Sequence, residues 1–151
     1  MLGFLRALAE YEGLTRDCVI DLARVRRHFF GRRAPVRALL ASIGHAPAGL
    51  AVYSPTYSTF AARPGLWVED VFVMPEARGH GVGRALFAAL AGIASRRGCD
   101  RLTFSVLTWN RPALAFYKRL GAEPVSGWTQ RRIAGAALRR LAAAGRPRRG
   151  R

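Results

Sequence analysis

Short stretches in which apolar positions alternate with polar ones, or follow each other without a break, predict β-strands. Five such stretches are Val36–Ile43, Ala48–Tyr57, Leu66–Met74, Leu102–Val106 and Gly127–Ile133. The third is nearly all apolar except for two acids, which is typical of a central strand. Pro75 ends it, because proline has no N–H to donate to a neighbouring strand.

Apolar residues at helical spacing predict helices between and around these strands. Val82, Leu86, Leu90 and Ile93 mark a helix that ends near Gly98. The other expected helices are Leu2–Glu12, a segment from Thr15 or Asp17 to Phe30, a segment from Asn110 or Arg111 to Leu120, and Ala134–Ala144. This order predicts an α+β fold around a mostly antiparallel sheet, with at least one strand–helix–strand crossover.

The strand Leu66–Met74 carries two adjacent acids, Glu69 and Asp70. Successive side chains of a strand point to opposite faces of the sheet. Strict alternation therefore predicts that the two carboxylates lie on opposite faces and form no pair, which makes Asp70 a structural residue. The face of Glu69 would hold Trp67, Val71 and Val73, and the other face Val68 and Phe72.

The length of 151 residues fits one compact domain, and a chain that is half apolar excludes a wholly disordered protein. No apolar stretch approaches the roughly 18 residues that span a bilayer. Residues 1–12 do not resemble a signal peptide, so a cytoplasmic protein is expected. Cys18 and Cys99 are too few for a disulfide framework, and the three histidines are isolated, so no metal site is expected.

The formal net charge is +16, and Lys118 is the one lysine among 25 basic residues. Residues 131–151 hold eight arginines and no acid. Such a field attracts polyanions, from nucleic acid to a phosphate-bearing cofactor, without selecting among them. The segment lacks interleaved aromatic residues and any recognition motif, so a solvated basic tail, disordered from Gly145 onward, is favoured over a specific nucleic-acid site.

Three closely spaced glycines lie between the strand that ends at Pro75 and the helix that follows. Gly79, Gly81 and Gly83 permit a tight turn and the close approach of a ligand. The N–H groups at the start of the helix favour an anion. The spacing differs from those of a dinucleotide fingerprint and of a nucleotide P-loop. The segment predicts a pyrophosphate site, and the alternative is a glycine-rich turn without a ligand.

The run Arg78-Gly79-His80-Gly81-Val82-Gly83 resembles the acyl-CoA-binding motif of the GNAT superfamily of N-acetyltransferases. Four further segments are similar to its diamine acetyltransferase branch, which includes spermidine/spermine and thialysine enzymes: Tyr57–Phe60, Trp67–Val73, Trp109–Pro112 and Phe116–Ala122. The resemblance implies the GNAT fold, here without the family's first strand. It implies one acetyltransferase domain over residues 1–133, followed by a basic helix and tail over residues 134–151.

The resemblance also implies acetyl-CoA as co-substrate, and no metal. Residues 71–73 would pair with the pantetheine arm like an added strand, and the glycine loop would hold the pyrophosphate. The residues implied to contact the cofactor are Val71, Phe72, Val73, Arg78, Gly79, His80, Gly81, Val82, Gly83, Arg84, Thr103, Phe104, Ser105, Asn110, Arg111, Pro112 and Ala113.

By the same resemblance, Tyr117 is the general acid that gives a proton to the leaving coenzyme A thiolate. Glu69 matches the acid that binds the amine and takes its proton through water. Such a base is needed because a primary amine with a pKa of about 10.4 is mostly protonated at pH 7. Tyr11 and Glu12 match a segment that contacts a cationic substrate. Trp67 is a further candidate to bind the amine.

Trp67, Tyr53 and Tyr57 are either walls for an alkyl ammonium group or ordinary core residues. Ser58 occupies a position where the spermidine enzymes carry an acid. Together with the positive net charge, which repels a polycation, this favours a shorter amine or an amino-acid side chain.

The expected function is direct transfer of an acetyl group from acetyl-CoA to a primary amine of a small molecule such as a diamine, a polyamine or thialysine. The alternatives are an amine on a protein, an aminoglycoside or an aminophosphonate, or a non-catalytic module that binds the cofactor or nucleic acid. The resemblance implies a homodimer. Neither a specific nucleic acid nor a membrane is expected as a partner.

Overall fold

The computed structural model describes residues 1–145 and divides the chain into two compact units. The first unit is Met1–Phe116, and the second begins at Tyr117. The boundary falls inside helix α4 (Arg111–Arg119), so this helix contributes residues to both units.

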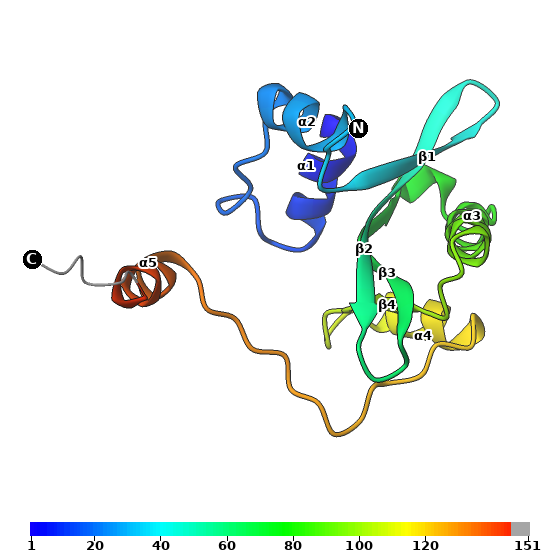
Figure 1. Ribbon diagram of the computed structural model, residues 1–151. Coiled ribbons are helices and arrows are strands. Elements are labelled where there is room, and N and C mark those ends of the chain that lie inside the picture. The colour runs from blue at the N-terminus through cyan, green and yellow to red at the C-terminus, as the bar shows by residue number, and fades with distance from the viewer. Residues whose placement is uncertain (146–151) are drawn as a thin grey trace, which may run out of the picture. The chain divides into compact units, whose positions relative to one another are not determined.

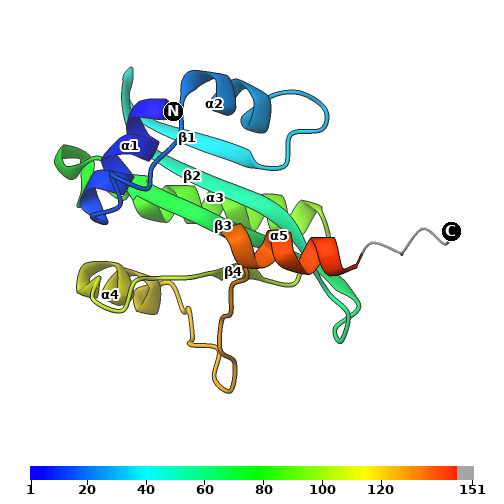
Figure 2. The ribbon, with the colours of Figure 1, turned by 90° about the vertical axis from the view of Figure 1, so that its left-hand side faces the viewer.

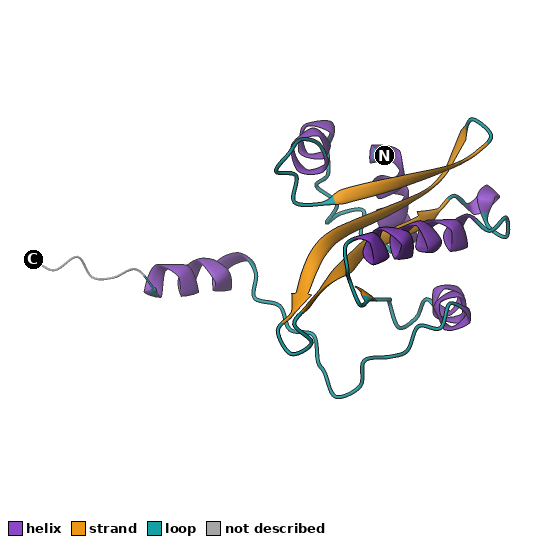
Figure 3. Cartoon of the chain, turned by 45° about the vertical axis from the view of Figure 1, so that its right-hand side comes forward, coloured by secondary structure: helices purple, strands orange, loops and turns teal. Residues whose placement is uncertain are grey.

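A four-stranded sheet forms the centre of the first unit, with the order β1-β2-β3-β4 (Figure 3). Strands β1 (Arg37–Ile43), β2 (Ala46–Ser58) and β3 (Arg63–Val73) are antiparallel neighbours, whereas β4 (Leu102–Phe104) is parallel to β3. Helix α3 (Val82–Arg96) supplies the crossover that a parallel neighbour requires. The predicted α+β fold with a mostly antiparallel sheet is confirmed, and the first element in the chain is a helix.

Helices cover both faces of this sheet (Figures 1 and 2). Helix α3 packs on one face, where Leu86 and Leu90 join Leu66 and Val68 in a buried cluster. Helix α1 (Leu2–Tyr11) packs on the other, where Phe4 and Leu8 meet Leu50, Val52 and Phe72. Burial of these side chains away from water is the main force that holds each helix on the sheet. We call the two sides the α3 face and the α1 face.

A β-bulge in β3 changes which side chains share a face. The register of the β2–β3 pair shifts between Asp70 and Val68, so Glu69 is the extra residue of the bulge. Val68 and Val71 would lie on opposite faces of a regular strand, but both pack into the core on the α3 face. The prediction from strict alternation therefore holds for Glu69, which shares a face with Trp67, and is wrong from Asp70 onward.

The bulge places both acids on the α1 face. Asp70 pairs across the sheet with Val52, whose side chain belongs to the α1-face core, as does that of Phe72 two residues further on. Trp67 Nε1 donates a hydrogen bond to Glu69 Oε2 at 2.5 Å, so the side chains of these two residues lie on the same face of the sheet. The two carboxylates that were predicted to lie apart are neighbours on one side of the sheet.

Helix α2 (Leu22–Phe29) begins later than the sequence pattern suggested. Its N-cap is Asp21, in extended backbone, and Asp21 Oδ1 accepts a hydrogen bond from Arg24 N at 2.7 Å. This contact satisfies one of the N–H groups that a helix leaves unpaired at its start. Thr15 and Asp17 lie in a turn before the helix and do not cap it.

The second unit contains helix α5 (Gly135–Ala144), as predicted over 134–144. The strand expected over Gly127–Ile133 is not formed in the described residues, and this part of the chain is irregular. A strand needs a neighbour to take its backbone hydrogen bonds, and no strand of the described sheet pairs with this segment. The basic end expected to be disordered lies, from residue 146, outside the described residues.

Two further expectations concern the cysteines and the possibility of a membrane-spanning helix. Cys18 and Cys99 are both free thiols and are half-buried. Over residues 1–145, none of the helices combines the length and the apolar character that crossing a bilayer requires.

Candidate active site

The glycine loop joins the end of β3 to the start of α3. After Val73, a short 3-10 helix, η1 (Pro75–Ala77), is followed by Gly79 and Gly81, both in the left-handed region with φ near 80°. Gly81 is the N-cap of α3 and offers no side chain to the first N–H groups of that helix. These N–H groups are therefore available to an anion at the positive end of the helix dipole.

The three glycines of the motif serve different purposes. A Cβ at Gly79 or Gly81 would meet nothing within 4 Å, so their backbone angles alone require glycine, and the space around them is open to a ligand. Gly83 has no such backbone requirement. A Cβ there would lie 3.2 Å from the ring of Phe116, which packs on Phe87 of α3. Gly83 therefore lets α4 approach α3, and the expectation that all three glycines contact the cofactor stays a prediction.

We expect the free energy of unfolding of Gly83→Ala to be lower than that of Gly92→Ala by about 1 to 3 kcal/mol, because the new methyl group lies 3.2 Å from the Phe116 ring, which has to shift by a few tenths of an ångström. Gly92→Ala on the same helix is the matched control. Its Cβ would meet only the flexible end of Arg96 at 3.4 Å. Since alanine favours helix over glycine by about 1 kcal/mol, this variant should be as stable as the parent or more so. Urea unfolding measures both, and equal effects would contradict the packing role.

The C-terminal part of β3 has a backbone edge without a neighbouring strand among the described residues. Pairing between β3 and β4 stops at Val68 and Phe104, while β3 continues to Val73 with β2 as its neighbour. In the described sheet, the edge of residues 69–73 that turns away from β2 takes part in no strand pairing. An extended ligand can add to such an edge through backbone hydrogen bonds. The edge leads directly into the glycine loop.

Beside this edge lies a group of three carboxylates. The side chain of Asp70 is partly buried on the α1 face, and burial, together with the nearby charges of Glu69 and Glu12, raises its pKa to about 6. Burial also raises the pKa of Glu12, which directly follows α1. Glu69 itself is exposed. Acids that disfavour one another's charge in this way are stabilised by a cation placed between them.

A cluster around Tyr11 connects α1 with the glycine loop and the start of α4. The guanidinium carbon of Arg78 lies 5.0 Å from the centre of the Tyr11 ring, and Arg78 Nε donates to the Val73 carbonyl at 3.2 Å. The hydroxyl of Tyr11 donates to Asn110 Oδ1 at 3.3 Å, and its ring lies 6.1 Å from that of Trp109. Residues predicted separately for the amine and for the cofactor are thus in direct contact.

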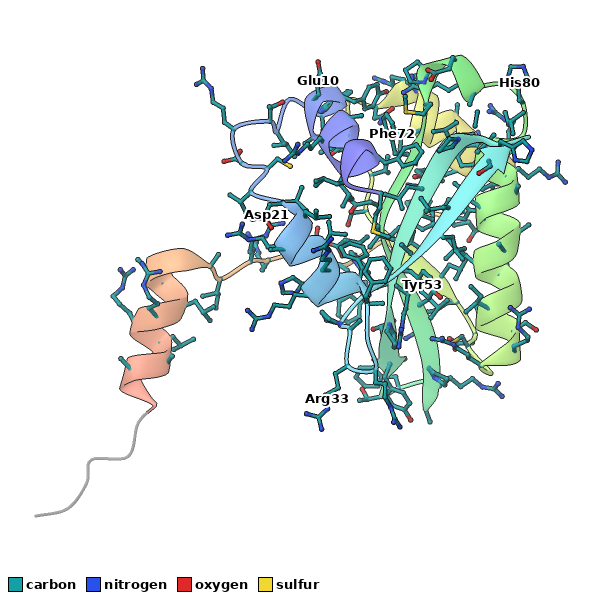
Figure 4. All side chains as sticks on the ribbon, turned by 90° about the horizontal axis from the view of Figure 1, so that it is seen from above. Glu10, Asp21, Arg33, Tyr53, Phe72 and His80 are labelled. Atoms are coloured by element: carbon teal, nitrogen blue, oxygen red, sulfur yellow. The ribbon has the colours of Figure 1, made fainter. Side chains whose placement is uncertain are left out.

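The remaining predicted residues lie on the same elements. Thr103 and Phe104 belong to β4, and Ser105 follows it directly. Asn110 accepts a hydrogen bond from Ala113 N at 3.2 Å, and Arg111 and Pro112 form the first turn of α4. His80 lies at the tip of the glycine loop, with Nδ1 3.0 Å from the Arg78 carbonyl oxygen (Figure 4). Val82 is buried and Arg84 exposed in the first turn of α3.

Tyr117 is the first residue of the second unit and lies on α4, directly after Phe116. Its backbone carbonyl accepts hydrogen bonds from Leu120 N at 3.0 Å and from Ala122 N at 3.1 Å, which end the helix. These contacts agree with the predicted end of this helix near Leu120.

Sequence reasoning missed the part that Asp70 plays in the acidic group. A usable signal was present, because the order apolar–acid–acid–apolar over Val68–Val71 breaks the alternation of a strand and is what a bulge with both acids on one face produces. Of the aromatic residues considered as walls, Tyr53 packs in the α3-face core, away from the acids. Tyr57 is exposed on β2, and Trp67 contacts Glu69.

Comparison with known proteins agrees with this geometry. The Acetyltransferase (GNAT) family matches residues 6–122. The thialysine N-epsilon-acetyltransferase of Bos taurus is 36% identical over 153 residues, which cover 94% of this chain and 89% of that protein. The L-ornithine N5-acetyltransferase of Arabidopsis thaliana is 34% identical over 94 residues, 62% of this chain and 41% of that protein. An integron cassette protein from the mobile metagenome of V. cholerae superimposes with a TM-score of 0.79 at 28% identity, covering 93% and 88% of the two chains.

The family match assigns this mixed sheet, with its open strand edge and its glycine loop at a helix start, to an acetyltransferase. The chain belongs to the GNAT family, whose enzymes use acetyl-CoA as co-substrate. The prediction of an N-acetyltransferase that acts on a small-molecule amine is confirmed by its relatives.

Proposed function

We propose that this enzyme transfers an acetyl group from acetyl-CoA to the side-chain amine of a thialysine-like amino acid or of a short diamine. The observation that carries the proposal is the placement, on one strand, of the carboxylates of Glu69 and Asp70 next to the open edge of residues 71–73. An ammonium group held by the acids lies beside a thioester held by the edge. Such placement converts a bimolecular reaction into an effectively unimolecular one.

The cofactor has a matching set of contacts. The backbone of Val71–Val73 forms hydrogen bonds with the amide groups of the pantetheine arm. The N–H groups from Gly79 to Arg84 hold the pyrophosphate, and the space above Gly79 and Gly81 supports this assignment, since a Cβ there would meet nothing within 4 Å. Arg78 and Arg84 add positive charge at the same end of α3.

The amine has to lose a proton before it can attack. Glu69 accepts this proton through water, while Asp70 and Glu12 balance the remaining positive charge of the substrate. The Trp67 indole fixes the carboxylate of Glu69 through its hydrogen bond. The nitrogen then forms a bond to the thioester carbon, the carbon–sulfur bond breaks, and the hydroxyl of Tyr117 gives its proton to the sulfur. The second proton of the attacking nitrogen leaves as the amide forms and returns through water to the Tyr117 phenolate, while Glu69 releases its proton to the solvent. Atoms and charge balance without a metal or a covalent enzyme intermediate.

A short substrate suits the charges of this chain better than a polyamine does. The side chain of Ser58 accepts a hydrogen bond from Ala61 N at 3.2 Å and so belongs to the turn between β2 and β3. It offers no negative charge to a second ammonium group. The net charge of +16 also repels a polycation at long range. The similar proteins named for thialysine and for L-ornithine act on amines of amino-acid side chains, which supports this choice.

The proposal is tested by mixing the full-length protein with acetyl-CoA and a panel of thialysine, ornithine, lysine, diaminobutane, spermidine and a protein with exposed lysines. We expect release of free thiol with at least one amino acid or diamine, and a value of kcat/KM at least about tenfold higher than with spermidine, from the charge argument above. Tight binding of coenzyme A without turnover on any amine would favour the non-catalytic alternative. Preference for spermidine or for the protein would contradict the proposed substrate.

We also propose that the enzyme is a homodimer. The second unit exposes large apolar side chains, with exposed fractions of 69% for Val125, 78% for Trp128 and 59% for Ile133. The pattern of this segment predicts a strand, yet no strand of the described chain pairs with it. Contact with a second copy would bury these side chains.

We expect a dimer in sedimentation at micromolar concentration, and Trp128→Ser should raise the dimer dissociation constant by about tenfold or more, because a large aromatic side chain at an interface contributes about 2 kcal/mol or more. Phe60→Ser, at a side chain that is 96% exposed in the first unit, is the control and should leave the dimer intact. A monomeric parent protein would overturn this part of the proposal.

A further inference from the structure

Three parts of the proposed site meet at one side chain, that of Tyr11 at the end of α1. The resemblance to diamine acetyltransferases implies that this residue contacts the amine. In the structure, Tyr11 contacts Arg78, Trp109 and Asn110. Arg78 and Asn110 are both among the residues proposed for acetyl-CoA, so Tyr11 touches the cofactor residues of two separate loops.

The contact with Asn110 fixes the orientation of a buried amide. Asn110 is 9% exposed and is the one buried polar side chain in the described part of the molecule. Its Oδ1 accepts two hydrogen bonds, from the Tyr11 hydroxyl and from Ala113 N. Both acceptor positions of this oxygen are thereby used, and the Nδ2 donors must point the other way. Without the hydroxyl, one of the two contacts that fix this amide is lost.

The contact with Arg78 fixes a cation at the end of the open edge. The guanidinium is held over the Tyr11 ring and donates through Nε to the carbonyl of Val73, the last residue of β3. Arg78 is otherwise exposed and precedes the first glycine of the loop. An exposed arginine loses much side-chain freedom when it binds a phosphate, and prior fixation by an aromatic ring reduces this cost.

We propose that Tyr11 is a positioning residue for acetyl-CoA, which holds Arg78 at the start of the glycine loop and Asn110 at the start of α4 before the cofactor arrives. This inference rests on the proposed binding of acetyl-CoA and adds a residue that acts on it through others. The proposal predicts that a change of Tyr11 alters the Kd of the cofactor. A change of a residue that contacts the amine would instead alter the KM of the amine.

Titration calorimetry with coenzyme A on the full-length protein tests the inference. Tyr11→Leu removes the ring and the hydroxyl, and should raise the Kd of coenzyme A by about five- to tenfold, as the loss of a cation–π contact and a hydrogen bond predicts. Tyr11→Phe keeps the ring and should raise it about two- to threefold, through Asn110 alone. The KM of the amine should change less than about twofold in both, since neither variant alters the three carboxylates.

Two controls separate positioning from a general loss of structure. Phe60→Leu makes a similar change of side chain at a residue that is 96% exposed, and should leave the Kd unchanged. In an Arg78→Met background, Tyr11→Leu should have only the smaller effect of Tyr11→Phe, because the contact with the guanidinium is already absent. Loss of structure would give equal effects in both backgrounds and a lower melting temperature.

The outcomes are distinct. If the parent protein binds coenzyme A and both Tyr11 variants bind it equally well, the positioning role is wrong while the proposed function stands. A rise in the KM of the amine with an unchanged Kd of coenzyme A would return Tyr11 to the amine site. If the parent protein itself binds no coenzyme A, the proposed function and this inference are both wrong.

Discussion

We expect Tyr117→Phe to lower kcat for acetyl transfer by about 100-fold or more, the usual contribution of a positioned general acid. The coenzyme A thiolate is a strong nucleophile that can return to the acyl carbon, and protonation by Tyr117 prevents this reversal. Phenylalanine keeps the shape of the side chain and removes only the proton donor. Steady-state assays of thiol release, with the preferred amine of the panel, measure the effect.

The same variant should bind coenzyme A with a Kd within about twofold of the parent, because the phenol is needed only while the bond to sulfur breaks. The hydrogen bonds that Tyr117 accepts from Leu120 and Ala122 use its backbone carbonyl, so the substitution leaves these two bonds in place. A variant that binds the cofactor normally and turns over at the parent's rate would remove Tyr117 from the role of general acid.

The second large effect is expected from the acidic group. Glu69→Gln and Asp70→Asn should each lower kcat/KM for the amine by about 10-fold or more at about pH 7.5, since each removes a charge that holds the ammonium group or a base that accepts its proton. Glu10→Gln is the matched control. Glu10 is an exposed carboxylate on α1, and its side chain points away from the sheet (Figure 4).

The pKa of Asp70, raised to about 6, sets the pH dependence of this effect. Asp70 is neutral below about pH 6 and charged above it, so kcat/KM for the amine should fall as the pH drops through 6. Asp70→Asn should remove this fall. Glu69→Gln should move it to lower pH, because the charge of Glu69 is one cause of the raised pKa. A profile with the same fall in Asp70→Asn would assign it to another group.

Stability should respond to the same titration with a definite sign. The pKa of Asp70 in the folded protein lies above its ordinary value of 3.8, so folding is favoured by protonation of this group. Its contribution to stability is present at low pH and is lost as the pH rises through 6. Asp70→Asn should therefore stabilise the protein more at about pH 7.5 than at about pH 4.5, while Glu10→Gln should show no such difference. Urea unfolding at the two pH values measures this.

Local sequence patterns were sufficient to predict the helices, strands and turns that form the site. The glycine spacing after Pro75 and the helix from Val82 follow from backbone freedom and from apolar residues every three or four positions, both of which act within a few residues. For the same reason the start of α4 at Arg111 and the strand β2 could be placed from the sequence. The family motifs then linked these elements to one chemistry.

Tertiary structure alone decided what depends on a neighbour far along the chain. The bulge at Glu69 exists because β3 must pair with β2 and still bury Val68 and Val71 on one face, and this brought Asp70 into the acidic group. The expected strand over 127–133 lacks a partner strand in the described chain. The contacts of Tyr11 with Arg78 and Asn110 join residues up to 99 positions apart. No short window of sequence contains such pairs. The sequence therefore determined which residue types are present, and only the tertiary structure brought these residues into contact.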